Sequence, residues 1–246
     1  MNNTKKNEKN STKLFNILFK DWTAFEKIWL SLFTLINIYL FFSWGDTWIG
    51  LTASLTGMLC VVLTAKGKMS SFYWGLINIL AYSYVAYQSA YYGDVGLNLL
   101  YFLPMTFVGI YYWKNNLNNK EENKTVLVKS LSWNHKLIWF IGSLIALYFL
   151  GLFLKMIQGT LPFVDSTTTI FSIVATILLT RRFTDQWFYW ILVDIWSIVM
   201  WAYIFLRDGN QVSMLVMWTA YLVNAVYGYY NWRKLERKQK RVEYDI

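Results

Sequence analysis

Residues 73–94 read YWGLINILAYSYVAYQSAYYGD, and residues 189–210 read YWILVDIWSIVMWAYIFLRDGN. Both stretches begin with Tyr-Trp, carry a polar residue at the sixth position and end with Gly before an Asp or Asn, at a constant offset of 116 residues. After an insertion of three residues, Gly109-Ile110-Tyr111 pairs in the same way with Gly228-Tyr229-Tyr230. The chain is therefore an internal duplication. A duplicated helix bundle in a bilayer is typical of a transporter whose pathway lies between the copies.

Composition places most of the chain in a membrane. Of its 246 residues, 56% are hydrophobic and 15% are charged, whereas average soluble domains carry about 25% charged residues. The net charge of +9 does not indicate nucleic acid, because the basic residues stand at the ends of apolar runs, where membrane topology places them. Cys60 is the single cysteine, so no intramolecular disulfide is expected. No cluster of Cys, His and carboxylates predicts a metal, and no cofactor is expected.

Eight apolar segments predict membrane helices, because each approaches the roughly 20 residues that cross the hydrocarbon core. They are Ile28–Trp44, Trp48–Leu63, Tyr73–Ala90, Leu97–Trp113, Leu137–Leu154, Thr167–Leu179, Trp187–Leu206 and Val212–Tyr230. When both termini are placed in the cytoplasm, all of the 23 Lys and Arg residues except Lys155 and Arg207 fall on the cytoplasmic side. The positive-inside rule favours this orientation.

The predicted spans group as one additional helix, then three, one and three. Three crossings leave the two ends of a bundle on opposite sides of the membrane, and one linking helix lets the second bundle start on the same side as the first. The fold class is therefore an all-α integral membrane protein with two parallel bundles related by an axis along the membrane normal. Its predicted parts are the N-terminal tail and additional helix (1–46), first bundle (47–114), cytoplasmic loop and linker helix (115–164), second bundle (165–232) and basic cytoplasmic tail (233–246).

Asp194 is the only carboxylate well inside a predicted span, and its repeat counterpart is Asn78. Ionisable residues inside a membrane are costly and usually face a cavity, so these two positions predict one shared central site. The alternative is a hydrogen bond that only joins the two bundles.

Tryptophans surround the carboxylate of Asp194 at spacings of three and four, which place them on one helix face. The members of this face are Trp187, Trp190, Asp194, Ser197 and Trp201. Such a face fits a flat, cationic or electron-poor ring, held by stacking and cation–π attraction. The alternative is an aromatic girdle that faces lipid.

The last span adds Trp218, Tyr221 and Asn224 at spacings of three, and a mid-span Asn needs a partner in the bilayer. In the first copy, Pro104 loosens the corresponding helix and can free a backbone carbonyl toward a cavity. Together with Trp74, the repeat counterpart of Trp190, the candidate substrate-binding residues are Trp187, Trp190, Asp194, Asn78, Asn224, Tyr221, Trp218, Asn98, Thr106 and Trp74.

Several motifs in order resemble the PnuC family of bacterial vitamin transporters. They are Lys66 leading to Gly75-Leu76-Ile77-Asn78, Gly109-Ile110-Tyr111-Tyr112-Trp113, and Thr180-Arg181-Arg182-Phe183 leading to the W-x-x-W of Trp187 and Trp190. The resemblance covers about Trp48 to Trp232. It implies a SWEET-like 3+1+3 fold, often trimeric, that takes up nicotinamide riboside by facilitated diffusion across the inner membrane. A cytoplasmic riboside kinase would then trap the vitamin by phosphorylation.

The same resemblance implies roles for individual residues. Trp187 and Trp190 would stack on or gate around the nicotinamide, and Asn78 and Asn224 match polar positions of the family pathway. Two positions depart from the pattern, because many relatives have Asn in place of Asp194 and an amide in place of Thr106. Either change can shift the preferred vitamin.

Three other functions are open from the residues. A transporter of thiamine is one, because thiamine is also flat and cationic and Asp194 suits either vitamin. An intramembrane enzyme would need paired catalytic groups, and only Asp194 is available, so the chain is not expected to be an enzyme. A receptor or scaffold is the third, and flux into liposomes would separate it from a transporter. In every case the expected partners are a small molecule and membrane lipids, with no nucleic acid.

Overall fold

The computed structural model describes residues 22–44, 47–88, 95–118, 125–158, 161–208 and 212–244. Helices dominate these segments, and none of them contains a strand. The elements are α2 (Ala24–Trp44), α3 (Trp48–Ala65), α4 (Ser70–Gln88), η1 (Leu97–Phe102), α6 (Leu103–Lys114), α7 (Trp133–Met156), α8 (Pro162–Thr180), α9 (Gln186–Asp208) and α10 (Val212–Tyr244). Because η1 and α6 are continuous, the described segments hold eight helices, one for each predicted span. The predicted N-terminal tail, up to residue 21, lies outside them.

Capping residues set where two of the helices begin. At α2, the Thr23 N–H donates to Glu26 Oε2 over 2.7 Å and the Glu26 N–H donates to Thr23 Oγ1 over 3.2 Å, a reciprocal capping box. At α8, Pro162 occupies the first turn, where proline is favoured. The predicted start near Thr167 was therefore too late, because a search for apolar residues stops at the polar Asp165 and Ser166.

The third helix of the first bundle begins as a π-helix. In η1 the turn is wider, and the Leu103 N–H donates to the carbonyl of Asn98, five residues back. Pro104 follows directly and has no N–H to donate. A π-helical turn accommodates one more residue than an α-helical turn, so this helix carries an additional residue that the α-helical α10 does not.

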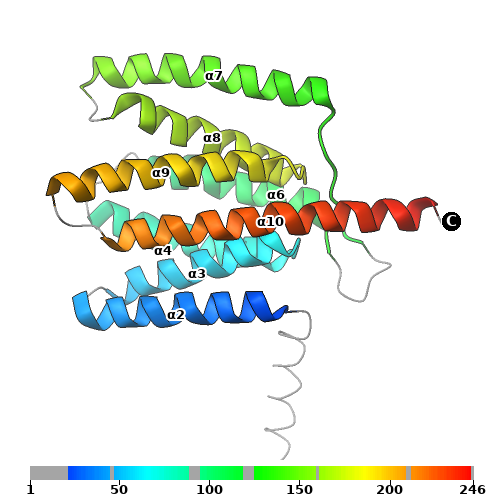
Figure 1. Cartoon of the computed structure of the whole chain (residues 1–246), viewed down its shortest axis with the longest axis horizontal. Coiled ribbons are helices and arrows are strands. Elements are labelled where there is room, and N and C mark those ends of the chain that lie inside the picture. Colours follow the sequence, from blue (N-terminus) through cyan, green and yellow to red (C-terminus); the bar gives the residue numbers. More distant parts are fainter. Residues whose placement is uncertain are drawn as a thin grey trace, which may run out of the picture.

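The helices lie side by side, and α3 and α8 start at the same end of the molecule (Figure 1). Within each bundle, the first helix packs on the second, as α3 does on α4 and α8 on α9. Between the bundles, the first helix of each contacts the third helix of the other: α3 contacts α10, and α8 contacts α6. Moreover, α2 packs on α3 as α7 packs on α8, so the additional helix and the linker helix hold equivalent places.

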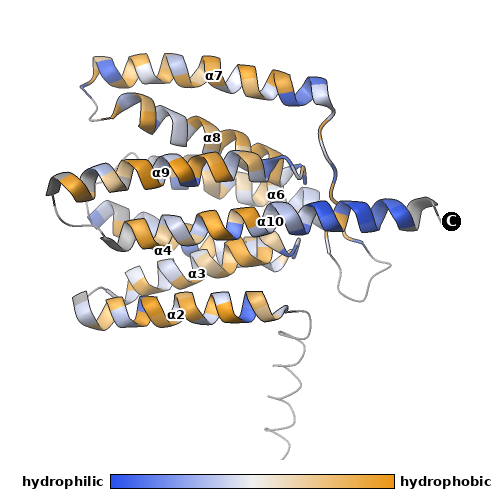
Figure 2. Cartoon of the chain, viewed as in Figure 1, coloured by the Kyte–Doolittle hydropathy of each residue, from blue (hydrophilic) through white to orange (hydrophobic). Residues whose placement is uncertain are grey.

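Within the segments that the structure describes, four helices are long and apolar enough to cross a membrane: α2, α3, α7 and α8. α9 contains a shorter apolar stretch, Gln186–Met200. The remaining helices run alongside these four but carry more tyrosine, tryptophan and asparagine (Figure 1). Figure 2 shows that the C-terminal part of α10 is hydrophilic and extends beyond the neighbouring helices. α10 thus continues as one helix through residue 233, where the basic tail was predicted to begin.

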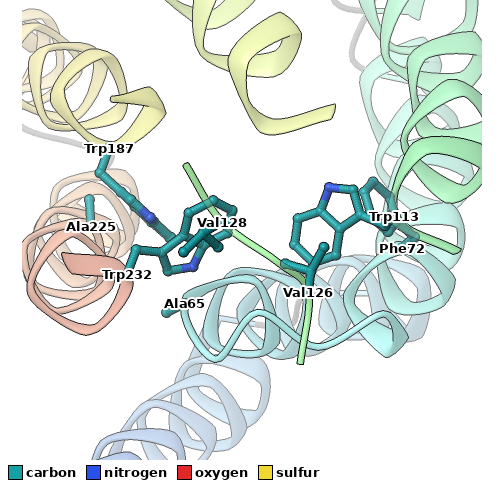
Figure 3. Close-up of a cluster of buried hydrophobic side chains, with 8 residues drawn as sticks. All are labelled: Ala65, Phe72, Trp113, Val126, Val128, Trp187, Ala225 and Trp232. Atoms are coloured by element: carbon teal, nitrogen blue, oxygen red, sulfur yellow. The ribbon is translucent and has the colours of Figure 1, made fainter. Parts of the chain in front are cut away.

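A cluster of buried apolar side chains joins the two bundles at the end of the molecule from which α10 projects (Figure 3). The Trp113 Nε1–H donates to the carbonyl of Leu179 over 3.0 Å, and the Trp232 Nε1–H donates to the carbonyl of Thr64 over 2.8 Å. Each third-helix tryptophan therefore satisfies a carbonyl at the C-terminal end of the other bundle's first helix. The cluster consists of Ala65, Phe72, Trp113, Val126, Val128, Trp187, Ala225 and Trp232.

Candidate functional site

The face of α9 that carries Asp194 points into the protein. Asp194 is 3% exposed and Ser197 is 1% exposed, whereas Ile195 and Val199 on the opposite face are 41% and 47% exposed. Trp190 is partly buried and packs against the buried clusters of both bundles. An aromatic girdle facing lipid is therefore excluded for Trp190 and for Trp187, which is 3% exposed. The side chain of Trp201 lies outside the described part of the chain.

Asn78, the counterpart of Asp194, meets Tyr221 over Gly57. The Asn78 Nδ2–H donates to the carbonyl of Ala53 on α3 over 2.7 Å. A Cβ atom added at Gly57 would lie 2.8 Å from Asn78 Nδ2 and 2.9 Å from Tyr221 Oη. The missing side chain of Gly57 therefore lets helices α3, α4 and α10 bring their polar groups together at this point.

Tyr221 connects this group with the carboxylate on α9. It interacts electrostatically with Asp194, and its ring packs edge-on against Trp218 with centroids 5.8 Å apart. One turn further along α10, Asn224 is 2% exposed, and its Nδ2–H donates to the carbonyl of Val61 over 3.1 Å. Its Oδ1 has no hydrogen-bond partner in the described segments.

Asp194 lacks a compensating cation in the described part of the chain. No ion pair or hydrogen bond to its carboxylate occurs there, although the side chain is almost fully buried. An uncompensated buried carboxylate is costly unless a cation or hydrogen-bond donors reach it. The centre formed by Asn78, Asp194, Trp218, Tyr221 and Asn224 is therefore suited to a cationic ligand with hydroxyl groups.

Trp187 lies in the buried cluster at the end of α9. Its indole ring packs against Gly228, where an added Cβ would come within 2.5 Å of the ring, and against Trp232 at a centroid distance of 6.0 Å. The ring of Trp187 therefore helps to pack α9 against α10. Trp190 lies one helical turn closer to Asp194.

Three predicted residues lie apart from this centre or bond elsewhere. Trp74 is 37% exposed, unlike its counterpart Trp190. The Thr106 hydroxyl donates to the carbonyl of Phe102 in its own helix over 2.8 Å. Asn98 is buried within η1. Residues at equivalent positions of the repeat therefore have different side-chain environments in the two bundles.

Two residues were missed from the sequence, one beside the centre and one at the corresponding place on the other bundle. Gly57 was one, and the 116-residue offset that pairs it with Ile173 was the available signal. Tyr101 in η1 was the other, because its hydroxyl donates to the carbonyl of Ile173 over 2.8 Å. Tyr101 thus meets α8 at the position where Tyr221 meets α3. The extra residue of the π-helix brings Tyr101 to the position on its helix that Tyr221 holds on α10. A constant offset between the two repeats does not reveal this correspondence.

A cavity in the described part of the chain lies elsewhere, between α2 and α10. Its volume is about 280 Å³, and none of the predicted site residues lines it. The lining is apolar except for Thr219, whose hydroxyl donates to the Leu215 carbonyl in its own helix. The described residues also contain no group of His, Cys, Asp and Glu that could hold a metal ion.

The fold and this centre define a duplicated helical membrane protein with a polar site between its two copies, a class that includes small-solute transporters. The sequence model of a family described as "Nicotinamide mononucleotide transporter" matches residues 47–234. The chain is 37% identical over 224 residues to "Nicotinamide riboside transporter PnuC" of Neisseria mucosa, covering 90% of this chain and 85% of the relative. It is 34% identical over 217 residues to the protein of that name from Haemophilus influenzae, covering 88% of this chain and 93% of the relative.

A solved structure agrees with these relatives. It is described as "Crystal structure of the Vitamin B3 transporter PnuC" and matches with a TM-score of 0.78 and 37% sequence identity, covering 90% of this chain and 95% of that one. The chain belongs to the PnuC family of membrane transporters, as its motifs predicted. These relatives are named as transporters, which agrees with the expectation that the chain is not an enzyme.

Proposed function

We propose that this chain takes up nicotinamide riboside by facilitated diffusion across the bacterial inner membrane. Nicotinamide riboside is a flat pyridinium cation joined to a ribose. The observation that carries the proposal is the buried carboxylate of Asp194, which has no compensating cation in the described part of the chain. The carboxylate balances the pyridinium charge, Trp190 stacks on the ring, and the amides of Asn78 and Asn224 bond to ribose hydroxyls.

The remaining features of the proposal combine the family resemblance with the internal repeat and the positive-inside rule. The fold is SWEET-like with a 3+1+3 arrangement, in which residues 47–114 and 165–232 are the two bundles, and the assembly is a trimer. Both termini lie in the cytoplasm, where a riboside kinase phosphorylates the vitamin and so maintains its inward gradient. Trp218 and Trp187 border the centre, and Asn98, Thr106 and Trp74 line the pathway at a greater distance.

Calorimetry on the purified protein tests the substrate. Nicotinamide riboside should bind saturably, and thiamine should bind more weakly. Asp194→Asn should weaken binding of the cationic riboside more than binding of its neutral, reduced form, because only the cation interacts with the charge. As a control, Asp185→Asn alters a carboxylate that pairs with Lys136 and should leave the preference unchanged. A preference for thiamine would retain the transporter and replace the vitamin.

Flux measurements test the mechanism. Proteoliposomes without an ion gradient should equilibrate labelled riboside, and an enclosed kinase with ATP should make the label accumulate. A requirement for a proton or sodium gradient would contradict facilitated diffusion. Binding without flux would make the chain a receptor rather than a transporter.

A further inference from the structure

A buried amide at the start of α9 takes no part in the centre described above. Gln186 is 0% exposed. In the described part of the chain, neither its Nε2 nor its Oε1 has a hydrogen-bond partner. Buried side-chain amides normally satisfy both functions, and an unpaired buried donor or acceptor destabilises a fold. Gln186 therefore has unused hydrogen-bonding capacity in a place that bulk water does not reach.

The helix places Gln186 on the same face as the residues of the centre. Trp190 and Asp194 follow it at four and eight residues, the spacing at which side chains of an α-helix align. This face is buried, whereas Phe188 on the other side of the same turn is 46% exposed. Eight residues of α-helix span about 12 Å. The three side chains thus form a line with an amide at one end, an aromatic ring between, and a carboxylate at the other.

Two other site residues predicted from the sequence also have a buried polar atom without a hydrogen-bond partner in the described segments. Trp187, the next residue, has a buried Nε1 without a partner, and Asn224 on α10 has a buried Oδ1 without one. Among the residues with such atoms in the described segments, only Gln186 leaves two separate atoms unpaired, one a donor and the other an acceptor. The complementary group for Gln186 is therefore one that offers an acceptor and a donor side by side.

We infer that Gln186 is a specificity residue that recognises a primary carboxamide on the transported ring. A carboxamide offers one carbonyl oxygen and one N–H in a plane, which pair with Nε2–H and Oε1 of Gln186. Trp190 then lies along the ring and Asp194 lies near its positive nitrogen and the ribose. This inference rests on the proposed substrate and adds the chemical reason for its selection. A ring that offers no such donor and acceptor side by side, as in the pyridinium riboside without the carboxamide, leaves Gln186 unpaired, which a buried polar site penalises strongly.

A cycle of two ligands and two proteins measures this contact. The ligands are nicotinamide riboside and the pyridinium riboside that lacks the carboxamide, and the proteins are the full-length chain and its Gln186→Met variant. In the unaltered protein, the carboxamide should improve affinity by roughly tenfold to a hundredfold, as two neutral hydrogen bonds do. In Gln186→Met the two ribosides should bind with equal affinity. Gln239→Met, in a glutamine that bonds to the backbone of Val126 and Val128, is the matched control and should keep the difference.

Thermal unfolding of the ligand-free proteins provides the second readout. Gln186→Met replaces an unpaired amide by an apolar side chain of similar length, so the unfolding temperature should be unchanged or higher. A lower unfolding temperature, with the preference for the carboxamide intact, would make Gln186 a structural residue and overturn the inference alone. Failure of the unaltered protein to bind either riboside would overturn the proposed function, and this inference with it.

Discussion

The two bundles share the order and packing of their helices and differ in the polar residues at the centre. In both, a glycine of the third helix receives an aromatic ring from the second helix: Gly109 faces Phe72 and Gly228 faces Trp187. At the centre the bundles diverge, because Asn78 stands opposite Asp194 in the repeat and Gly57 opposite Ile173. The glycine is thus retained in both copies, whereas its aromatic partner comes from adjacent repeat positions, because Phe72 pairs with Phe188 in the repeat. The polar residues of the proposed site differ between the copies.

The ends of the first helices differ as well. In the first bundle, Lys66 Nζ pairs with Glu26 Oε2 at 2.6 Å, with side chains 7% and 2% exposed, and the Tyr227 hydroxyl donates to Glu26 Oε1 over 2.7 Å. In the second bundle the repeat counterpart of Lys66 is Arg182, which donates to the carbonyl of Leu127 over 2.9 Å. The additional helix α2 therefore supplies a buried countercharge that joins it to α3 and α10.

The largest effect is expected from breaking this pair. Lys66→Met leaves Glu26 buried without its countercharge, and removing one partner of a buried ion pair costs about 3–5 kcal/mol. Arg182→Met removes a hydrogen bond to a neutral carbonyl and should cost about 1–2 kcal/mol. Unfolding in detergent, followed by circular dichroism, compares the two variants. Equal losses of unfolding free energy would show that Lys66 and Arg182 contribute equally to stability, and would contradict this difference between the bundles.

A smaller loss of stability, with a larger loss of binding, is expected at Gly57. In Gly57→Ala the new Cβ would overlap Asn78 Nδ2 and Tyr221 Oη, and such overpacking costs about 1–3 kcal/mol. Because both polar groups must move, affinity for the riboside should fall by roughly tenfold or more. Ile173→Ala is the matched change in the second bundle and should retain affinity, since Tyr101 bonds there to the backbone carbonyl. Calorimetry on both variants decides whether the site is asymmetric.

The two tyrosines sharpen the comparison further. Tyr101→Phe removes the hydrogen bond to Ile173 and should cost about 1 kcal/mol of stability with little change in affinity. Tyr221→Phe should do the reverse, because its hydroxyl lies beside Asn78 and interacts with Asp194. Thermal unfolding and riboside titration of each variant separate these effects. Equal losses of affinity would place both tyrosines in the site.

The smallest effect concerns pH and the second bundle alone. Burial by itself raises the pKa of Glu236, but hydrogen bonds from Ser130 and Lys240 and the charges of Lys240 and Arg233 lower it below the usual 4.5. The ionised carboxylate therefore stabilises the fold above about pH 4.5, and this contribution is lost as the pH falls through the lower pKa of the folded state. The gain at neutral pH should be at most about 1 kcal/mol, because Lys240 is exposed.

Glu236→Gln tests this contribution. The variant should be slightly less stable than the unaltered protein at pH 7, and the two stabilities should converge in acid. Leu117 holds the counterpart position in the first bundle, so no matching term is expected there. A difference in stability that does not change with pH would assign the effect to packing instead of charge.

The sequence predicted the frame well because the signals for it are local. Apolar length gave one segment for each of the eight helices, and the offset between repeats identified their order. Asp194 was singled out because a carboxylate within a long apolar run is unusual whatever surrounds it, and the structure buries its side chain. By contrast, Trp187 was predicted as a stacking residue, and the space that its ring fills is made by Gly228 on another helix. Nothing in the sequence near Trp187 indicates that space.

Composition and repetition were thus sufficient to establish a duplicated, helical membrane protein, and ordered motifs were sufficient to show its resemblance to the PnuC family, because each of these signals resides in one segment or in the comparison of two. Only the tertiary structure decided that α3 contacts α10 and α8 contacts α6, that α2 matches α7, and that Gly57, Asn78 and Tyr221 meet. These contacts join residues from separate helices, and they depend on which side chains leave room for one another. Only the tertiary structure also showed what the π-helix does, because the Tyr101 hydroxyl that it positions bonds to the Ile173 carbonyl of a separate helix, α8.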